Sequence, residues 1–114
     1  NLRVKNRDGG TALGPWLVAA STIADPQQLR LTTHVNGKLV QEGTTADMVH
    51  DVASLIEYLS GIMTIGPGDV ILTGTPKGSV DVRPGDEVGC EVEGVGRLVN
   101  TLVDDWEPAP RQPT

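Results

Sequence analysis

The chain has 114 residues and a formal net charge of −6 at pH 7. Charged residues make up 21% and apolar residues 38%, a balance typical of a folded domain rather than a disordered chain. No apolar run approaches the ~18 residues that a membrane-spanning helix needs, and the acidic balance argues against nucleic acid or an anionic membrane as the main partner. The single cysteine, Cys90, excludes an intrachain disulfide and favours a cytoplasmic location.

The chain has several marks of a piece of a longer protein. It begins with Asn1 rather than Met, and it contains no Phe, so large core-filling side chains are scarce. It also carries 14 Gly and 8 Pro, which terminate or bend regular elements. We therefore expect a fragment with little core of its own.

The first half of the chain predicts a short strand followed by a hairpin. The apolar run at 16–20 follows a Gly- and Pro-punctuated start and predicts the strand. Residues 29–41 predict the hairpin: its first strand, 29–35, alternates with the period of two that strands require, and 38–41 returns as the second strand. Asn36 and Gly37 then supply the two positive-φ residues of a type I′ turn.

Residues 44–63 predict one long helix. Apolar side chains recur there at steps of three and four residues, which places them on one helical face. Thr44 is suited to cap the start, and Asp47 lies where the helix dipole favours an anion. Gly61 is expected near the end.

The second half predicts three further strands and a tail. The apolar run at 69–73 predicts a buried strand, and 87–93 with 97–103 predict a hairpin. Residues 106–114 predict a Pro-rich, disordered tail. The fold class expected from these elements is mostly β, a mixed sandwich or roll, with one long helix.

Most candidate chemical residues have an ordinary structural interpretation. Glu91 and Glu93 point to one face of a predicted strand and could hold a cation, but the alternation favours a solvated face. His34 and His50 lack metal-ligand spacing. Cys90 alternates with core residues and is expected to be a buried structural thiol.

Two segments carry more specific chemistry. In residues 72–78, a predicted strand ends in Thr73, Gly74 and Thr75, where the missing Cβ allows a ligand close to the backbone and two hydroxyls can bind a carboxylate. Residues 4–10 bring Lys5 and Asp8 into one Gly-flanked loop. Taken alone, the first is also an ordinary turn and the second an ordinary solvated loop.

Together these segments resemble the fumarylacetoacetate hydrolase family. The resemblance rests on KNRDGG, LGPWLV, VNGKLVQEGTTADMVH, PGDVILTGTPKG and RPGDEVGCEVEGVGRLVN, and it runs over nearly the whole chain. The sequence looks closest to the branch of isomerase/decarboxylases of homoprotocatechuate (4-hydroxyphenylacetate) catabolism, in its C-terminal half or subunit. The resemblance implies that residues 1–105 are the C-terminal portion of a catalytic domain of this family, with its mixed β-sandwich or roll.

The resemblance also implies an activity. Members act on 2-oxo acids that a divalent metal, usually Mg²⁺ or Mn²⁺, chelates. In this branch 5-carboxymethyl-2-oxohex-3-ene-1,6-dioate is decarboxylated and 2-hydroxyhepta-2,4-diene-1,7-dioate is isomerised. Carried over residue by residue, Lys5 matches the active-site lysine, which stabilises the enolate, and Thr75 matches the threonine that contacts the substrate carboxylate. Thr73 and Gly74 accompany Thr75. Asp8 matches an acidic residue that orients Lys5 or Arg7.

The metal site is where the chain departs from the family pattern. The family uses a Glu-x-Glu pair and an Asp that precede the lysine loop, so we expect no metal ligand within this chain and place the ligands upstream of Asn1. Glu91 and Glu93 imitate the pattern but fall in the last hairpin. The isolated chain is therefore expected to be inactive.

Other functions stay open on the sequence alone. Acylpyruvate hydrolysis or oxaloacetate decarboxylation would use the same enolate stabilisation. A non-catalytic assembly domain or truncated product is the alternative of another class. The expected partners are a small 2-oxo dicarboxylate or tricarboxylate and either further copies of the chain or an N-terminal half or subunit.

Overall fold

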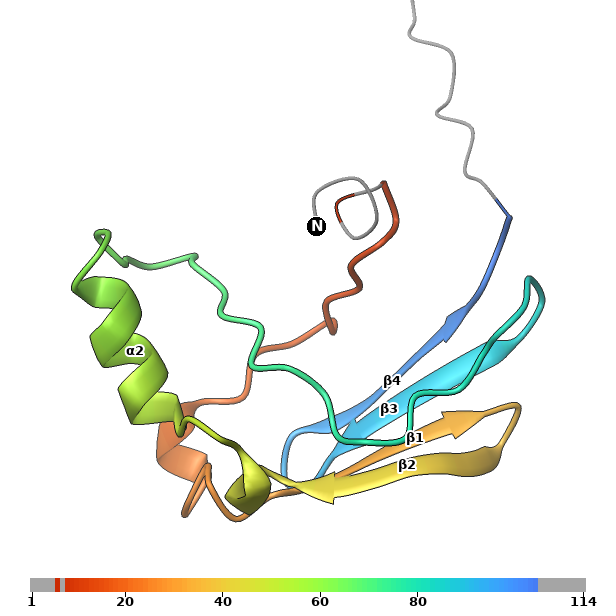
Figure 1. Cartoon of the computed structure of the whole chain (residues 1–114), viewed down its shortest axis with the longest axis horizontal. Helices are drawn as coiled ribbons and strands as arrows, with labels where there is room; N and C mark the ends of the chain where they lie inside the picture. Colours follow the sequence, from red (N-terminus) through yellow and green to blue (C-terminus); the bar gives the residue numbers. More distant parts are fainter. Residues whose placement is uncertain (1–5, 7, 105–114) are drawn as a thin grey trace, which may run out of the picture.

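A computed structural model describes residue 6 and residues 8–104 of the chain. These residues form a mostly β structure whose main element is one four-stranded antiparallel sheet with strand order β2-β1-β3-β4 (Figure 1). The strands are β1 (Arg30–Val35), β2 (Lys38–Thr44), β3 (Glu87–Val92) and β4 (Gly96–Thr101). Lys5 and the predicted tail at 106–114 lie outside the described residues.

The first predicted hairpin is confirmed. β1 and β2 pair antiparallel, and the register shifts between Thr33 and His34. Asn36 and Gly37 have φ values of 50° and 80°, so both residues at the turn occupy the left-handed region that a type I′ turn demands. The local turn chemistry therefore sets how these two strands pair.

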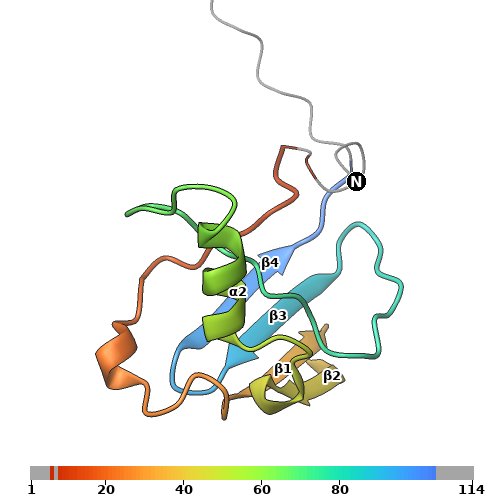
Figure 2. The same cartoon turned by 60° about the vertical axis from the view of Figure 1, so that its left-hand side comes forward.

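The second predicted hairpin is also confirmed. β3 pairs with β4 through a turn at Gly94 and Gly96, which both have positive φ. β3 also pairs with β1, so the two hairpins share one sheet although residues 45–86 separate them in sequence. Figures 1 and 2 show β3 and β4 lying beside the first hairpin.

The two faces of the sheet differ in chemistry. Thr33 lies opposite Cys90, which lies opposite Leu98, and cross-strand partners project from the same face. This face is largely apolar. The opposite face is polar: Arg97 lies over Gly89, with its Nη2 2.9 Å from where a Cβ would stand.

No apolar side chain among the described residues is buried, and the apolar sheet face has no layer packed on it that buries its side chains. The prediction that Cys90 is a buried thiol is therefore wrong for the described structure: Cys90 is exposed. The alternation that suggested burial is real, because Cys90 lies on the apolar face, but a face buries its residues only when another layer covers it.

The predicted long helix is wrong. The structure has a short 3₁₀ helix, η2 (Thr45–Asp47), and then α2 (Val52–Ser60), which is nine residues long. Thr44 Oγ1 accepts from the Ala46 amide, so it caps η2 rather than α2. The backbone of Met48 is extended, with φ −61° and ψ 134°, and this interrupts the helix.

Side chains on both sides of this break hold it in place. Asp51 Oδ1 accepts from the Ser54 amide at 2.7 Å and caps α2. The Gln27 carboxamide bridges the gap, because Nε2 donates to the Thr45 carbonyl and Oε1 accepts from the Val52 amide. Apolar periodicity alone does not reveal such a break. Gly61 follows α2 as expected.

Two predicted strands are absent. Residues 16–20 contain no strand, only the start of a 3₁₀ turn, η1 (Ala20–Thr22), and residues 69–73 are irregular. Val70 is 59% and Leu72 is 72% exposed. A strand needs a neighbour for its backbone hydrogen bonds, and no described segment pairs with either run. None of the described helices is long and apolar enough to cross a membrane.

Candidate functional site

The predicted site residues fall in two places. Asp8 lines a cavity on the apolar face of the sheet, together with Asn6 and Gly10. Thr73, Gly74 and Thr75 lie in the irregular segment between α2 and β3, and all three are exposed. They do not line that cavity, so the described residues do not bring Asp8 and Thr75 into one pocket. Lys5 belongs to the part of the chain that is not described.

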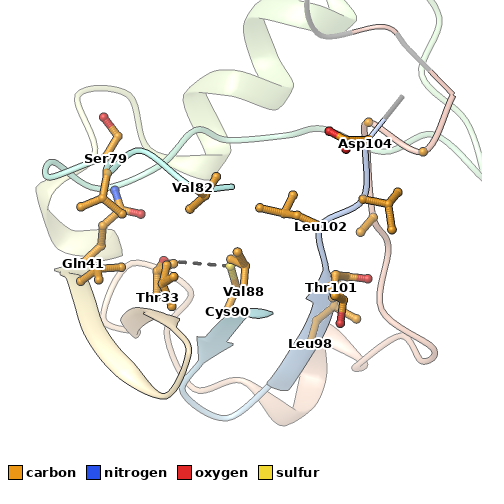
Figure 3. A pocket seen from close by; sticks show the side chains of 18 of the residues that line it. Thr33, Gln41, Ser79, Val82, Val88, Cys90, Leu98, Thr101, Leu102 and Asp104 are labelled. Atoms are coloured by element: carbon orange, nitrogen blue, oxygen red, sulfur yellow. Dashed lines mark hydrogen bonds between the residues drawn. The ribbon is translucent and has the colours of Figure 1, made fainter. Parts of the chain in front are cut away.

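The cavity has a volume of about 1090 Å³ and lies between the sheet and two irregular segments (Figure 3). Its floor is the apolar sheet face, including Val88, Cys90 and Leu98. The Thr33 Oγ1 and Cys90 Sγ atoms are 4.0 Å apart on this floor. Polar side chains also line the cavity, among them Gln41, Ser79 and Asp104.

The Gly74 backbone is held in a conformation that favours glycine. Its φ is +105°, which L side chains rarely adopt, and a Cβ built there would meet no atom within 4 Å. The backbone on either side of Gly74 is therefore open to solvent, with the side chains of Thr73 and Thr75 as its neighbours.

The chain just after Thr75 packs against β2. Gln41 Nε2 donates to the Pro76 carbonyl at 2.9 Å and to the Lys77 carbonyl at 3.4 Å. A Cβ at Gly43 would lie 2.8 Å from Pro76 Cβ, so only glycine lets the proline sit there. We did not predict these contacts, because Gln41 and Gly43 look like ordinary residues of a predicted strand.

A second contact ties the irregular segment to the first hairpin. Asn36 Nδ2 donates to Asp86 Oδ1 at 2.8 Å, and the Arg83 amide donates to Asp86 Oδ2 at 2.7 Å. Two hydrogen bonds lower the pKa of the Asp86 carboxyl. The larger effect comes from the Asn36 side chain and the smaller one from the Arg83 backbone amide. Asp51 behaves alike, because hydrogen bonds from Ser54 lower its pKa.

The described residues do not fit a metal ion. No group of three or more His, Cys, Asp or Glu side chains gathers within residue 6 and residues 8–104. Glu91 and Glu93 are both exposed, as a solvated face predicts, and Glu93 Oε2 accepts from the Arg30 amide at 3.2 Å. His50 is exposed, and the Nδ1 of half-buried His34 has no described partner.

The fold and this loop define a mostly β domain that offers an open Gly-Thr loop beside an edge strand. The family model of the fumarylacetoacetate (FAA) hydrolase C-terminal region matches residues 1–103. The chain therefore belongs to the fumarylacetoacetate hydrolase family.

Individual relatives agree with this placement. The chain is 60% identical over 103 residues to the 4-hydroxyphenylacetate degradation bifunctional isomerase/decarboxylase of Salmonella dublin, a match that covers 90% of this chain and 24% of that protein. The structure of 5-carboxymethyl-2-hydroxymuconate delta-isomerase from Mycobacterium smegmatis matches with a TM-score of 0.72 and 47% identity, covering 79% of this chain and 35% of the other.

A third relative has been solved with ligands. Maleylpyruvate hydrolase from Sphingobium sp. SYK-6, in complex with a manganese(II) ion and pyruvate, matches with a TM-score of 0.76 and 38% identity. That match covers 79% of this chain and 34% of the other. The chain thus spans only about a quarter of the length of the curated relative from Salmonella dublin, whose match covers 24% of that protein.

Proposed function

We propose that the protein carrying this chain is a metal-dependent isomerase/decarboxylase of homoprotocatechuate catabolism. Its substrates are 5-carboxymethyl-2-oxohex-3-ene-1,6-dioate, which it decarboxylates, and 2-hydroxyhepta-2,4-diene-1,7-dioate, which it isomerises. The observation that carries the proposal is the 60% identity to a bifunctional isomerase/decarboxylase across 90% of this chain. Residues 1–105 then form the C-terminal portion of the catalytic domain.

Lys5 is assigned the stabilisation of negative charge. When the carbon–carboxylate bond breaks and carbon dioxide leaves, the bonding electron pair delocalises onto the 2-oxo group as a dienolate. A positioned ammonium lowers the energy of this charge without giving up its proton. Isomerisation passes through the same dienolate and then needs a proton delivered to carbon. One charged group thus serves both reactions.

Thr75 is assigned to a substrate carboxylate, with Thr73 and Gly74 completing the contact. Hydroxyl donors bind carboxylates, and the left-handed φ of Gly74 leaves the loop free of a Cβ. The exposure of all three residues supports this role. Asp8 is assigned to orienting Lys5 or its neighbour Arg7, because a carboxylate in the same short loop holds a cation in one place.

The metal is proposed to be Mg²⁺ or Mn²⁺, bound by residues other than those described here. The maleylpyruvate hydrolase relative has been solved with manganese(II) and pyruvate, which supports a divalent ion beside a 2-oxo acid. When bound, such an ion would act as a Lewis acid. The described residues do not gather the ligands for it, so no step is assigned to it through this chain.

The test is Lys5→Ala in the complete encoded protein, assayed with both substrates and Mg²⁺ or Mn²⁺. Loss of a preorganised charge-stabilising group lowers kcat by roughly a hundredfold or more, and we expect that loss here with an unchanged circular dichroism spectrum. Lys38→Ala, at an exposed lysine of β2, is the matched control and should keep full activity. Near-full kcat in Lys5→Ala would overturn the assignment.

A second candidate keeps the family and changes the reaction. The match to maleylpyruvate hydrolase favours hydrolysis of an acylpyruvate, and oxaloacetate decarboxylation would use the same charge stabilisation. Assaying the dienedioate, an acylpyruvate and oxaloacetate side by side separates these activities, because kcat/KM ranks them directly. We further propose a cytoplasmic protein that assembles with other copies or with an N-terminal half or subunit.

A further inference from the structure

The loop that carries Thr75 is fastened to the sheet by a side chain with no assigned role. We propose that Gln41 is a positioning residue that fixes the Thr75 hydroxyl for the substrate carboxylate. Gln41 does this by holding the Pro76 and Lys77 carbonyls against β2. This inference rests on the carboxylate-binding role proposed for Thr75.

The first support is the set of contacts that Gln41 makes. Its Nε2 lies 2.9 Å from the Pro76 oxygen and 3.4 Å from the Lys77 oxygen, so one amide group serves two successive carbonyls. The side chain is half-buried, and a hydrogen bond is worth more there than in open water. β2 is an edge strand, which leaves room beside it for the loop.

The second support is the shape of β2 around Gln41. A Cβ at Gly43 would approach Pro76 Cβ and Cγ to 2.8 and 2.9 Å, so the proline ring occupies the place of a missing side chain. A Cβ at Gly78 would lie 3.6 Å from the Val40 carbonyl oxygen. The loop therefore lies along β2 from Val40 to Gly43, with Gln41 between these two contacts.

The third support is the short distance along the chain from the anchor to Thr75. The anchored carbonyl belongs to Pro76, the residue directly after Thr75. The proline ring fixes its own φ, and it restricts the preceding residue to extended conformations. With Pro76 held, the backbone of Thr75 is tethered on its C-terminal side. Among the described residues, Gln41 is therefore the side chain whose loss should most directly loosen the threonine.

The test compares Gln41→Met with Gln28→Met in the complete encoded protein. Methionine keeps the length of the side chain and removes the donor. Gln28 is exposed, so the same exchange there serves as the control. Trypsin cleavage after Lys77, followed by mass spectrometry, should become roughly three- to tenfold faster in Gln41→Met only, because release of the two carbonyls frees the loop from β2. Cleavage after Arg97 of β4 should keep its rate in both variants.

The kinetic readout is the isomerisation of 2-hydroxyhepta-2,4-diene-1,7-dioate. Gln41→Met should raise KM by roughly three- to tenfold and leave kcat within about twofold, because binding of the carboxylate weakens while the reacting carbons keep their partners. Gly43→Ala keeps the Gln41 donor but pushes on Pro76, and it should raise KM in the same way. Combined with Thr75→Val, Gln41→Met should raise KM no further.

The outcomes separate this inference from the proposed function. An unchanged rate of trypsin cleavage after Lys77 in Gln41→Met overturns the positioning role, whether or not the protein turns over the dienedioate. A raised KM in Thr75→Val with an unchanged KM in Gln41→Met also overturns it, and leaves the proposed function standing. An unchanged KM in Thr75→Val overturns the carboxylate role of Thr75, and with it the route by which Gln41 would act.

Discussion

The sheet and the irregular segment between α2 and β3 are about equally rich in apolar residues, yet only the sheet is regular. Every strand of the sheet has a hydrogen-bonded neighbour, whereas residues 61–86 contain no strand although they include the apolar run at 69–73. In the sheet, adjacent hairpins satisfy one another's backbone groups. The irregular segment has no such neighbour among the described residues. Apolar sequence therefore predicts a strand only where a partner exists.

The largest expected effect concerns the exposed Leu72, and it tests whether the proposed assembly covers the irregular segment. Leu72→Ala in the complete encoded protein should lower the free energy of unfolding by about 2–5 kcal/mol, as for a buried leucine, because we propose that another part of the assembled protein covers it. Urea denaturation followed by circular dichroism measures the loss.

Leu39→Ala is the matched control for that experiment. Leu39 lies on β2 and is 44% exposed, against 72% for Leu72. If the irregular segment is covered in the assembled protein, Leu72→Ala lowers the free energy of unfolding more than Leu39→Ala does, although Leu72 is the more exposed of the two here. A smaller loss of unfolding free energy in Leu72→Ala than in Leu39→Ala would show that the irregular segment stays open to water. The whole protein would then also have a paired sheet beside an uncovered segment.

The next effect breaks the regular region at its turn. Gly37 has φ of 80°, a conformation that a β-branched residue adopts only under strain. Gly37→Val should therefore lower the free energy of unfolding by about 1–3 kcal/mol. Gly37→Asn is the control and should cost less, because asparagine tolerates this conformation. Equal losses in the two variants, measured by urea denaturation, would contradict a type I′ requirement at this position.

The smallest effect concerns one hydrogen bond between the first hairpin and the irregular segment, from Asn36 to Asp86. Hydrogen bonds hold the pKa of Asp86 below its usual range, so its carboxylate stabilises the fold above the unfolded pKa, and this contribution is lost as the pH falls through the folded pKa. Asn36→Asp keeps the acceptor for the Glu87 amide and removes the donor to Asp86. The pKa of Asp86 should then rise.

Carboxyl-carbon NMR titration measures this shift. Asp51, whose pKa is lowered by Ser54 instead, should titrate alike in both proteins and serves as the internal control. A pKa of Asp86 that does not change in Asn36→Asp would mean that the two regions are not joined through this pair in solution.

The sequence predicted the two hairpins for a local reason. Asn36-Gly37 and the alternation around Cys90 act over a few residues, and the structure has the strands they predict. The ligand-binding role of Thr73, Gly74 and Thr75 stays a prediction. The role of Lys5 remains a prediction, because the structure does not describe that residue.

Other features could not be predicted because they depend on contacts between distant residues. The helix predicted for 44–63 is interrupted where Gln27 bonds to Thr45 and Val52. Gln41 reaches Pro76 across 35 positions in the chain, and nothing near either residue indicates this. Cys90 lies on the predicted face but is exposed, because burial depends on what covers that face.

The sequence by itself determined the family and the two hairpins, since each rests on residues close together in the chain. The tertiary structure alone decided that the hairpins share one sheet, that α2 is short, and that Pro76 is held next to β2 through Gln41 and Gly43. The physical reason is range. Turn and strand preferences are set by neighbours in sequence, whereas pairing, capping by distant side chains and the fit of Pro76 over Gly43 exist only once the chain has folded.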